Sequence, residues 1–438
     1  MSDFIRTLCD SEKENLVRCR RDLHKYPEIP GTEYRSACRI IQELQRIGYD
    51  EIHYGDGVMD LKAVKDVLSD RETAKACYAR ALEEGADPAI ISKMKWHKTA
   101  VMAVLRCGEG PVVGLRADFD ALPVIENDRP DHIPNKEGFD SVHPKIMHAC
   151  GHDAHASIAL SVAKIMKDLA DQGKIHGTIK FFFQPGEEGS IGGHAMAEAG
   201  IADDVDYLLA IHIGVGTKKT GQIAATAVDF PSLTHYDVHY EGLTSHSGVA
   251  PQDGKNALLA ACTAVKGIYG LSRHAKGWSR VNVGTLNSGI VSNAVPGFAD
   301  MRVELRAAND IVMDRLVQQA RCVLKGAAQM YECKVTIKNR GTNVGAPCDS
   351  AWIDILREAT DPIPEVTEFL PVASMSGAGE DAPRLMLKAQ AHGGIATYMM
   401  IGSDLSTAPH TANFDVDEKS LSIGTETVVR AFYNIMKN

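Results

Sequence analysis

The chain of 438 residues has no apolar run that approaches the ~20 residues needed to cross a bilayer. Its first residues, MSDFIRT, lack the apolar core of a signal peptide, so we expect a cytoplasmic protein that has no membrane partner. The ten cysteines include no CxxC pair. In a reducing compartment, most of them are expected to serve as small buried side chains.

The sequence also lacks the features of nucleotide and nucleic-acid binding. No G-x-G-x-x-G or P-loop pattern occurs, which argues against a dehydrogenase or a nucleotide-binding protein. The net charge is −10, and the one dense basic cluster, Arg18 to Arg21, has acidic residues close by. We therefore expect no nucleic-acid partner. An apolar fraction of 44% is ordinary for a folded globular protein.

The N-terminal part of the chain favours helices. Apolar residues at helical spacing predict helices over Ser11 to Tyr26 and over about Glu33 to Ile47. Residues 58–98 are charged and helix-like, and Ser69-x-x-Glu72 matches a capping box. We interpret this stretch as an inserted helical element of unknown role.

Short apolar strands separated by loops and helices begin near Thr99. They are predicted over Val101 to Leu105, Val112 to Leu115, Thr178 to Phe183, Tyr207 to Ile211 and Thr397 to Ile401. Continuous apolar strands that alternate with helices, such as Ser157 to Leu169, indicate an α/β fold with a largely parallel mixed sheet flanked by helices.

The pattern changes between about Phe230 and Asn339. Here the order is strand, helix, strand, strand, helix, strand, and apolar and polar residues alternate along the strands. This order predicts an inserted ferredoxin-like βαββαβ module, which we interpret as a lid or dimerisation domain. We therefore expect a catalytic domain made of residues 1–229 and 341–438, and a lid domain of residues 230–340.

Candidate metal-binding side chains lie just past the predicted strand ends, where parallel sheets bind ligands. They are Asp118 and Asp120, Glu187 and Glu188, His212, and His410 after a longer loop. Cys150 and His152 are two residues apart. In an extended segment both side chains would point to the same side, as chelation of one metal requires.

The adjacent Glu187 and Glu188 predict two different roles. In an extended segment they would project to opposite sides, so one could bind metal while the other faces the substrate. A metal-bound carboxylate stays ionised, whereas its unligated neighbour can accept a proton from water and pass it to a leaving nitrogen.

A series of motifs along the chain carries a family resemblance. They are MHACGHDAH from Met147, PGEEG from Pro185, the strand ending in His212, SHSG from Ser245, SNAVP from Ser292, VELR from Val303, GAGED from Gly377 and the final PHTANFDVDE. Together they resemble the dinuclear metallohydrolase family of aminoacylases and carboxypeptidases, in its cysteine-containing amidohydrolase branch. The resemblance extends over nearly the whole chain, including the helical insertion.

The resemblance implies two divalent ions, Mn²⁺ or Zn²⁺, bound by five side chains, with the division of ligands between the ions left open. The implied ligands are Cys150, His152, Glu188, His212 and His410. Glu187 is implied as the general base and acid, and Asp120 as a residue that orients a ligand. In the carboxypeptidase branch a histidine ligand stands at the position of Asp118.

The resemblance also implies roles for the lid. His246 and Asn293 would hold the oxygen of the scissile carbonyl, and Arg306 would bind the carboxylate of the substrate. We expect a homodimer in which the neighbouring subunit supplies His246. A heteromer with a homologous subunit is the alternative.

The implied activity is hydrolysis of the amide bond of a small N-acyl amino acid, releasing glutamate or aspartate. p-Aminobenzoyl-glutamate is the first expectation for the substrate, and indole-3-acetyl-aspartate or another N-acyl acidic amino acid is the alternative. A different class, a catalytically idle partner subunit, would need neither the complete ligand set nor the Glu187–Glu188 pair.

Overall fold

The apolar strands expected from the sequence lie in one eight-stranded sheet of the computed structural model, which describes residues 3–66, 68–375 and 377–437. The chain divides into two units. The first comprises Met1–Val228, Ala346–Ser376 and Glu380–Asn438, and the second comprises Asp229–Gly345 and Gly377–Gly379. None of the helices in the described parts of the chain is long and apolar enough to span a bilayer.

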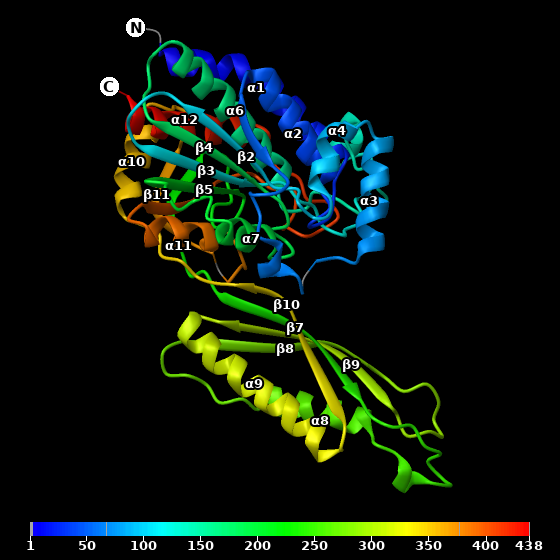
Figure 1. Ribbon diagram of the computed structural model, residues 1–438. Helices are drawn as coiled ribbons and strands as arrows, with labels where there is room; N and C mark the ends of the chain where they lie inside the picture. Colours follow the sequence, from blue (N-terminus) through cyan, green and yellow to red (C-terminus); the bar gives the residue numbers. More distant parts are fainter. Residues whose placement is uncertain (1–2, 67, 376, 438) are drawn as a thin grey trace. The chain divides into compact units, whose positions relative to one another are not determined.

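The sheet of the first unit has the order β1-β2-β4-β3-β5-β12-β6-β11 (Figure 1). Its strands are β1 (Glu51–Tyr54), β2 (Val101–Arg106), β3 (Val112–Asp118), β4 (Thr178–Gln184), β5 (Tyr207–Ile213), β6 (Gln222–Val228), β11 (Glu368–Ser374) and β12 (Ile395–Ile401). The neighbours β4, β3, β5 and β12 all run parallel, as do β6 and β11. The pairs β1–β2, β2–β4 and β6–β12 are antiparallel. The expected largely parallel mixed sheet is confirmed.

Helices cover both faces of this sheet (Figure 1). Helix α6 (His152–Asp171) packs on β3, β4 and β5 and is covered in turn by α1 (Phe4–Lys25), α2 (Tyr34–Ile47) and α12 (Lys419–Met436). Helix α10 (Ala351–Thr360) joins α12, while α7 (Gly192–Glu198) and α11 (Pro383–Ala391) pack together on β4 and on β5 and β12. Because α6 lies between the sheet and other helices, most of its residues are buried, including the polar His152, Asp153 and His155 near its start.

Two local expectations are wrong at helix starts. Helix α1 begins at Phe4 and not near Ser11, because the side chain of Asp3 accepts hydrogen bonds from the first backbone N–H groups and caps the helix. The expectation of a capping box that starts at Ser69 is also wrong. The N-cap of α3 (Arg71–Glu83) is Asp70, whose carboxylate accepts from two backbone N–H groups at 2.9 Å.

The remaining short elements of the insertion are η1 (Leu61–Val64), α4 (Pro88–Ile91) and η2 (Ser92–Met94), and a further short helix, α5 (Ile133–Glu137), precedes α6. The cysteines are less buried than expected. Four are buried and five are half-buried, while Cys322 is exposed because it lies on the outer side of its helix.

The second unit has a four-stranded antiparallel sheet of order β10-β7-β9-β8. Its elements are β7 (Ser232–Glu241), η3 (Pro251–Asp253), α8 (Ala257–Tyr269), β8 (Ser279–Ser288), β9 (Phe298–Ala307), α9 (Asp310–Met330) and β10 (Lys334–Asn343). They follow the βαββαβ order expected from the sequence. Alternate residues such as Tyr236, Val238 and Tyr240 are buried in a core with α8 and α9. The role of this unit as a lid or dimerisation domain stays a prediction.

Candidate metal centre

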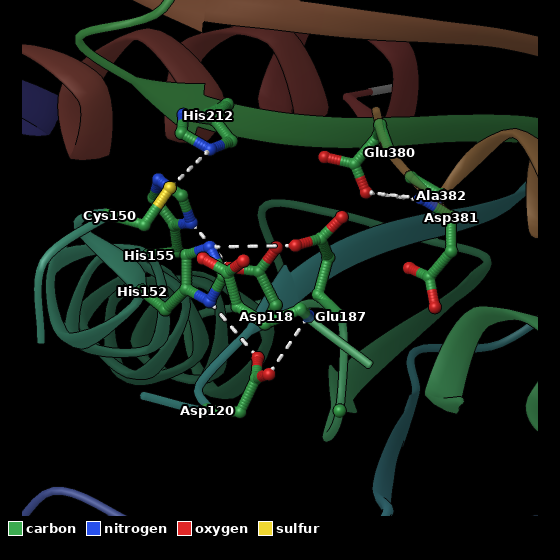
Figure 2. Close-up of polar contacts among 12 residues, drawn as sticks. Asp118, Asp120, Cys150, His152, His155, Glu187, His212, Glu380, Asp381 and Ala382 are labelled. Atoms are coloured by element: carbon green, nitrogen blue, oxygen red, sulfur yellow. Dashed lines mark hydrogen bonds and ion pairs between the residues drawn. The ribbon is translucent and has the colours of Figure 1, made fainter. Parts of the chain in front are cut away.

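The candidate metal ligands of the first unit come from neighbouring strand ends. His212 lies near the end of β5, Glu187 and Glu188 follow β4, and His410 lies in the loop between β12 and α12. Cys150 lies two residues before the start of α6. Because β4, β3, β5 and β12 are parallel neighbours, their carboxyl ends meet at one edge, where Figure 2 shows Cys150, His152, Glu187 and His212 close together.

The segment that carries Cys150 and His152 is not extended, so the geometric reason for expecting them to meet is wrong. Gly151 is the N-cap of α6 in a left-handed conformation (φ +90°), and His152 is the first helical residue. A Cβ on Gly151 would lie 2.5 Å from the Cγ2 of Ile213, so the turn requires glycine. The turn nevertheless brings Cys150 Sγ within 3.7 Å of the Nε2 of His212.

Asp120 links the start of α6, which carries His152, to the turn that carries Glu188. The Nδ1 of His152 donates to one carboxylate oxygen of Asp120 at 3.0 Å, and the backbone N–H of Glu188 donates to the other at 3.0 Å. The Nε2 of His152 is buried and has no hydrogen-bond partner among the described residues. A histidine whose outer nitrogen is held by a carboxylate and whose inner nitrogen is free has the arrangement of a metal ligand.

Two groups of donors share the Cys150 sulfur. One comprises Cys150, His152 and His212, the other Cys150, Glu188 and His410, and the donor atoms within each group lie within 4.8 Å of one another. The Nε2 of His410 is 3.3 Å from the Oε1 of Glu188. Donors of one ion at ~2.0–2.3 Å are roughly 3–4 Å apart, so the described side chains fit a bound divalent cation.

The protonation states of these donors differ. Burial lowers the pKa of His212 well below its usual value, so the ring is neutral and its Nδ1 donates to the carbonyl of Ile213 at 2.9 Å. The Nε2 of His212 is then available as a ligand. Burial, assisted by the charge of Glu188, raises the pKa of Cys150 to about 12. This thiol must therefore lose a proton when it binds a metal.

Glu187 and Glu188 lie in a turn and not in an extended segment, which corrects the expected geometry. Burial and the charges of Glu380 and Glu188 raise the pKa of Glu187 well above its usual value. Burial also opposes ionisation of Glu188, but its contacts with His410 and His152 outweigh burial and lower its pKa. Without a bound cation, the surroundings therefore favour the protonated form of Glu187 and the ionised form of Glu188.

Glu187 also faces the donor cluster. One of its carboxylate oxygens lies 4.0 Å from the Nε2 of His152, and Figure 2 shows the side chain between His152 and Glu380.

Asp118 and His155 lie beside this cluster, but their side chains already have hydrogen-bond or ion-pair partners. The Nδ1 of His155 contacts Asp118, and its Nε2 accepts from the backbone N–H of Ile213 at 2.8 Å. Asp118 also pairs with Arg116 at 2.8 Å. Burial opposes ionisation of Asp118, but Arg116 and the nearby histidines hold its pKa well below the usual value. This network fixes the end of β5 next to His212 and leaves His155 no free nitrogen for a metal.

The acidic pair of GAGED, Glu380 and Asp381, has no role that the sequence motifs imply. Glu380 and Asp381 both accept from the buried Nη2 of Arg116, at 2.9 and 3.1 Å. Asp381 also accepts from Gln184 at 2.6 Å, and Glu380 accepts from the hydroxyl of Tyr398. The signal that could have revealed this network is an arginine inside the otherwise apolar strand VVGLRAD, since a buried guanidinium requires acidic partners.

A second group without an expected role is Glu33, which is fully buried. One of its carboxylate oxygens accepts from the N–H of Gly31 at 2.7 Å and from the N–H of Gly186 at 2.9 Å, and the other accepts from Thr99 at 2.7 Å. Gly186 directly precedes the two glutamates. Glu33 therefore fixes the base of the loop that carries them.

The remaining predicted site residues belong to the second unit. The N–H of Ser247 donates to the carbonyl of Asn293 at 3.0 Å, so the loops of His246 and Asn293 lie side by side. Both residues are exposed. The Nδ1 of His246 accepts from the N–H groups of Gly248 and Val249 at 3.2 Å each, which leaves its Nε2 to act as a donor.

Arg306 is half-buried on β9 and already has partners. Its guanidinium makes two hydrogen bonds to the carboxylate of Glu304, at 2.8 and 3.0 Å, and a third to the carbonyl of Gly377 at 3.0 Å. A role in substrate binding would require Arg306 to share these contacts with the substrate carboxylate.

Comparison with known proteins identifies the class. The chain belongs to Peptidase family M20/M25/M40, which it matches over residues 114–434. It is 36% identical to indole-3-acetyl-aspartic acid hydrolase of Enterobacter agglomerans, over 99% of this chain and 98% of the relative. It is 34% identical to a p-aminobenzoyl-glutamate hydrolase subunit of Escherichia coli, over the same shares of the two chains.

Solved structures agree with this assignment. The aminobenzoyl-glutamate utilization protein of Klebsiella pneumoniae has a TM-score of 0.82 and 31% identity, over 99% of this chain and 98% of the other. A dinuclear metal binding peptidase of the M20 family from Bacillus subtilis has the same fold, with a TM-score of 0.67 and 20% identity, over 97% and 99% of the two chains. The protein is therefore a metallohydrolase of the amidohydrolase and peptidase type that uses divalent metal.

We expect Cys150→Ser to weaken divalent-metal binding by roughly tenfold or more, because a hydroxyl is a poor substitute for a thiolate. Metal binding should also release about one proton fewer than in the wild type. Because a proton competes for the sulfur, the wild-type affinity should rise from about pH 6 to about pH 9. Calorimetry in buffers of different ionisation enthalpy measures both quantities. Cys107→Ser, at another half-buried thiol of this unit, is the control. Unchanged affinity and proton release in Cys150→Ser would exclude the thiol from the site.

Proposed function

We propose that the protein hydrolyses the amide bond of N-acyl acidic amino acids, with p-aminobenzoyl-glutamate as the first substrate and indole-3-acetyl-aspartate as the alternative. The observation that carries the proposal is the pair of adjacent glutamates with unequal pKa shifts beside a complete set of metal donors. Full-length similarity to hydrolases named for these two substrates supports the substrate class. An idle partner subunit would need neither feature.

The proposed cofactor is a pair of divalent ions, Mn²⁺ or Zn²⁺, which suit mixed thiolate, imidazole and carboxylate ligands. One ion position has Cys150, His152 and His212 as ligands, and the other has Cys150, Glu188 and His410. The sharing of Cys150 by both donor groups supports this division. When bound, such ions polarise a scissile carbonyl and lower the pKa of water.

The protein side chains supply the remaining steps in this proposal. In its ionised form, which the charge of bound cations would favour, Glu187 accepts a proton from the attacking water and delivers it to the leaving nitrogen, and its raised pKa makes it the stronger base of the pair. His246 and Asn293 donate to the carbonyl oxygen as it gains negative charge. Arg306 binds the carboxylate of the released amino acid.

The first test is hydrolysis of p-aminobenzoyl-glutamate and indole-3-acetyl-aspartate with added Mn²⁺ or Zn²⁺. We expect turnover of both and a higher kcat/KM for the first.

Glu187→Gln should lower kcat by roughly 10²- to 10⁴-fold with unchanged metal content, because proton transfer is lost while ligation is kept. Glu188→Gln, the matched variant at the next position, should lose metal. Metal loss in Glu187→Gln would mean that the two roles are reversed, and no turnover of any N-acyl amino acid would refute the function.

A second test concerns Arg306. Arg306→Leu should lower kcat/KM for the acyl-glutamate by roughly ten- to a hundredfold, mainly through KM, because a hydrogen-bonded ion pair with the substrate carboxylate is lost. The corresponding acyl-amino acid amide, which lacks this carboxylate, should be affected little. Arg302→Leu is the matched control, since Arg302 lies on the same strand and pairs with Asp237. Equal losses on both substrates would give Arg306 a structural role only.

We further propose a homodimer in which His246 completes the site of the neighbouring protomer. The exposed loops of His246 and Asn293 and the sheet edge at β8 are consistent with such an arrangement. The alternative is a heteromer, since two relatives are named as one subunit of a hydrolase or as its homologue.

Mixing inactive His246→Ala and Glu187→Gln chains under subunit exchange tests the dimer. Half of the random dimers are mixed and each has one intact site of two, so roughly a quarter of the wild-type activity should return. Chains carrying both substitutions, mixed with wild type, control for exchange. No recovery after verified exchange would show that His246 acts within its own protomer or has no catalytic role.

A further inference from the structure

A buried charge cluster lies at the start of α6, and two of its members, Arg20 and His24, come from α1. Arg20 and His24 are one helical turn apart on this helix, and both are buried. The Nε of Arg20 and the Nδ1 of His24 both donate to the same oxygen of Asp153, each at 2.8 Å. The other oxygen of Asp153 is buried without a partner in the described chain, so these two donors hold the carboxylate.

Asp153 occupies the first turn of α6, directly after His152. A side chain fixed at this position limits the rotation and translation of the helix start, from which His152 projects and which Cys150 precedes. The charge cluster therefore lies one residue from a proposed ligand and is separated from it only by helical backbone.

Arg20 also reaches the loop that carries His410. Its Nη2 donates to the carboxylate of Asp415 at 2.5 Å, five residues beyond His410. The two ligand loops also meet directly, since the N–H of His410 donates to the carbonyl of Ala149 at 2.7 Å. The guanidinium of Arg20 thus contacts the segments that carry ligands of both proposed ion positions.

His24 is held at both ring nitrogens. Its Nε2 lies 3.0 Å from the carboxylate of Glu126, which also contacts His132 at 2.9 Å and accepts from the N–H of Ser141 at 2.6 Å. Burial disfavours a charged His24, but its bonds to Asp153 and Glu126 outweigh burial and raise its pKa to about 9. Both nitrogens therefore donate, and the ring has one defined orientation.

We propose that Arg20 and His24 are positioning residues for the metal centre, which act through Asp153 and Asp415 on the segments that carry Cys150, His152 and His410. The inference rests on the ligands proposed above. It assigns a function to residues outside the range of the family match, which begins at residue 114. Carboxylates and helix starts around metal ligands are commonly held by such outer contacts, and their loss weakens metal binding.

A matched pair of substitutions at His24 tests the proposal. The amide nitrogen of asparagine can take the place of Nδ1, so His24→Asn keeps the bond to Asp153 and loses the bond to Glu126. The amide nitrogen of glutamine can take the place of Nε2, so His24→Gln keeps the bond to Glu126 and loses the bond to Asp153. Both variants lose one buried hydrogen bond, and a purely structural role predicts equal effects.

We expect His24→Gln to weaken Mn²⁺ and Zn²⁺ binding by roughly 10- to 100-fold, and His24→Asn to weaken it less than about threefold. Competition with a chelator measures affinity, and the thiolate-to-cobalt absorption of the Co²⁺-loaded protein reports whether Cys150 is bound. Thermal unfolding of the metal-free variants should show equal shifts. Equal metal affinities for the two variants would overturn the proposal.

Arg20→Lys is the second variant, in case the histidine variants do not fold. It keeps the charge, but a lysine ammonium cannot reproduce the fork that joins Asp153 and Asp415. We expect roughly tenfold weaker metal binding, and wild-type affinity would overturn the proposal.

The wild type is measured in parallel. If it binds no metal through Cys150, the proposed ligand set fails. If it does and His24→Gln binds equally well, only the positioning role fails.

Discussion

Four neighbouring strands, β4, β3, β5 and β12, run parallel, and this arrangement determines where the candidate metal ligands lie. Their carboxyl ends share one edge of the sheet, so side chains that are more than two hundred residues apart in the sequence meet there. The strand ends are also held to one another. Arg116 on β3 pairs with Asp118 on its own strand and with Glu380 and Asp381 before α11. Asp118 in turn contacts the Nδ1 of His155, and the Nε2 of His155 accepts from the N–H of Ile213 at the end of β5.

The same buried charges give two adjacent glutamates different properties. Glu187 faces Glu380, whose charge adds to burial and favours the protonated form of Glu187. Glu188 faces His410 and His152, whose contacts favour its ionised form. A proton acceptor and a metal ligand can thus be neighbours in sequence without exchanging roles. The physical cause is the surrounding charge, because the two side chains are chemically identical.

The sequence was informative where local patterns decide the outcome. Apolar runs placed five of the eight sheet strands but missed β1, β6 and β11. Period-two alternation predicted the βαββαβ module, and the ends of the strands indicated where Glu188 and His212 lie. Local geometry was wrong where a glycine or a turn intervened. The segment from Cys150 to His152 and the pair Glu187–Glu188 are turns, because Gly151 is left-handed and the chain reverses after β4. The basic cluster of Arg18 to Arg21 gave no sign that Arg20 is buried.

The sequence by itself determined the class of the fold, the kinds of donor atoms and the strand ends that carry them, because these depend on residue type and short-range periodicity. The tertiary structure decided which donors share Cys150, which glutamate has the raised pKa, and which charges of α1 reach Asp153 and Asp415. These properties depend on distances between segments far apart in the chain and on burial, and no local pattern of residues contains either quantity.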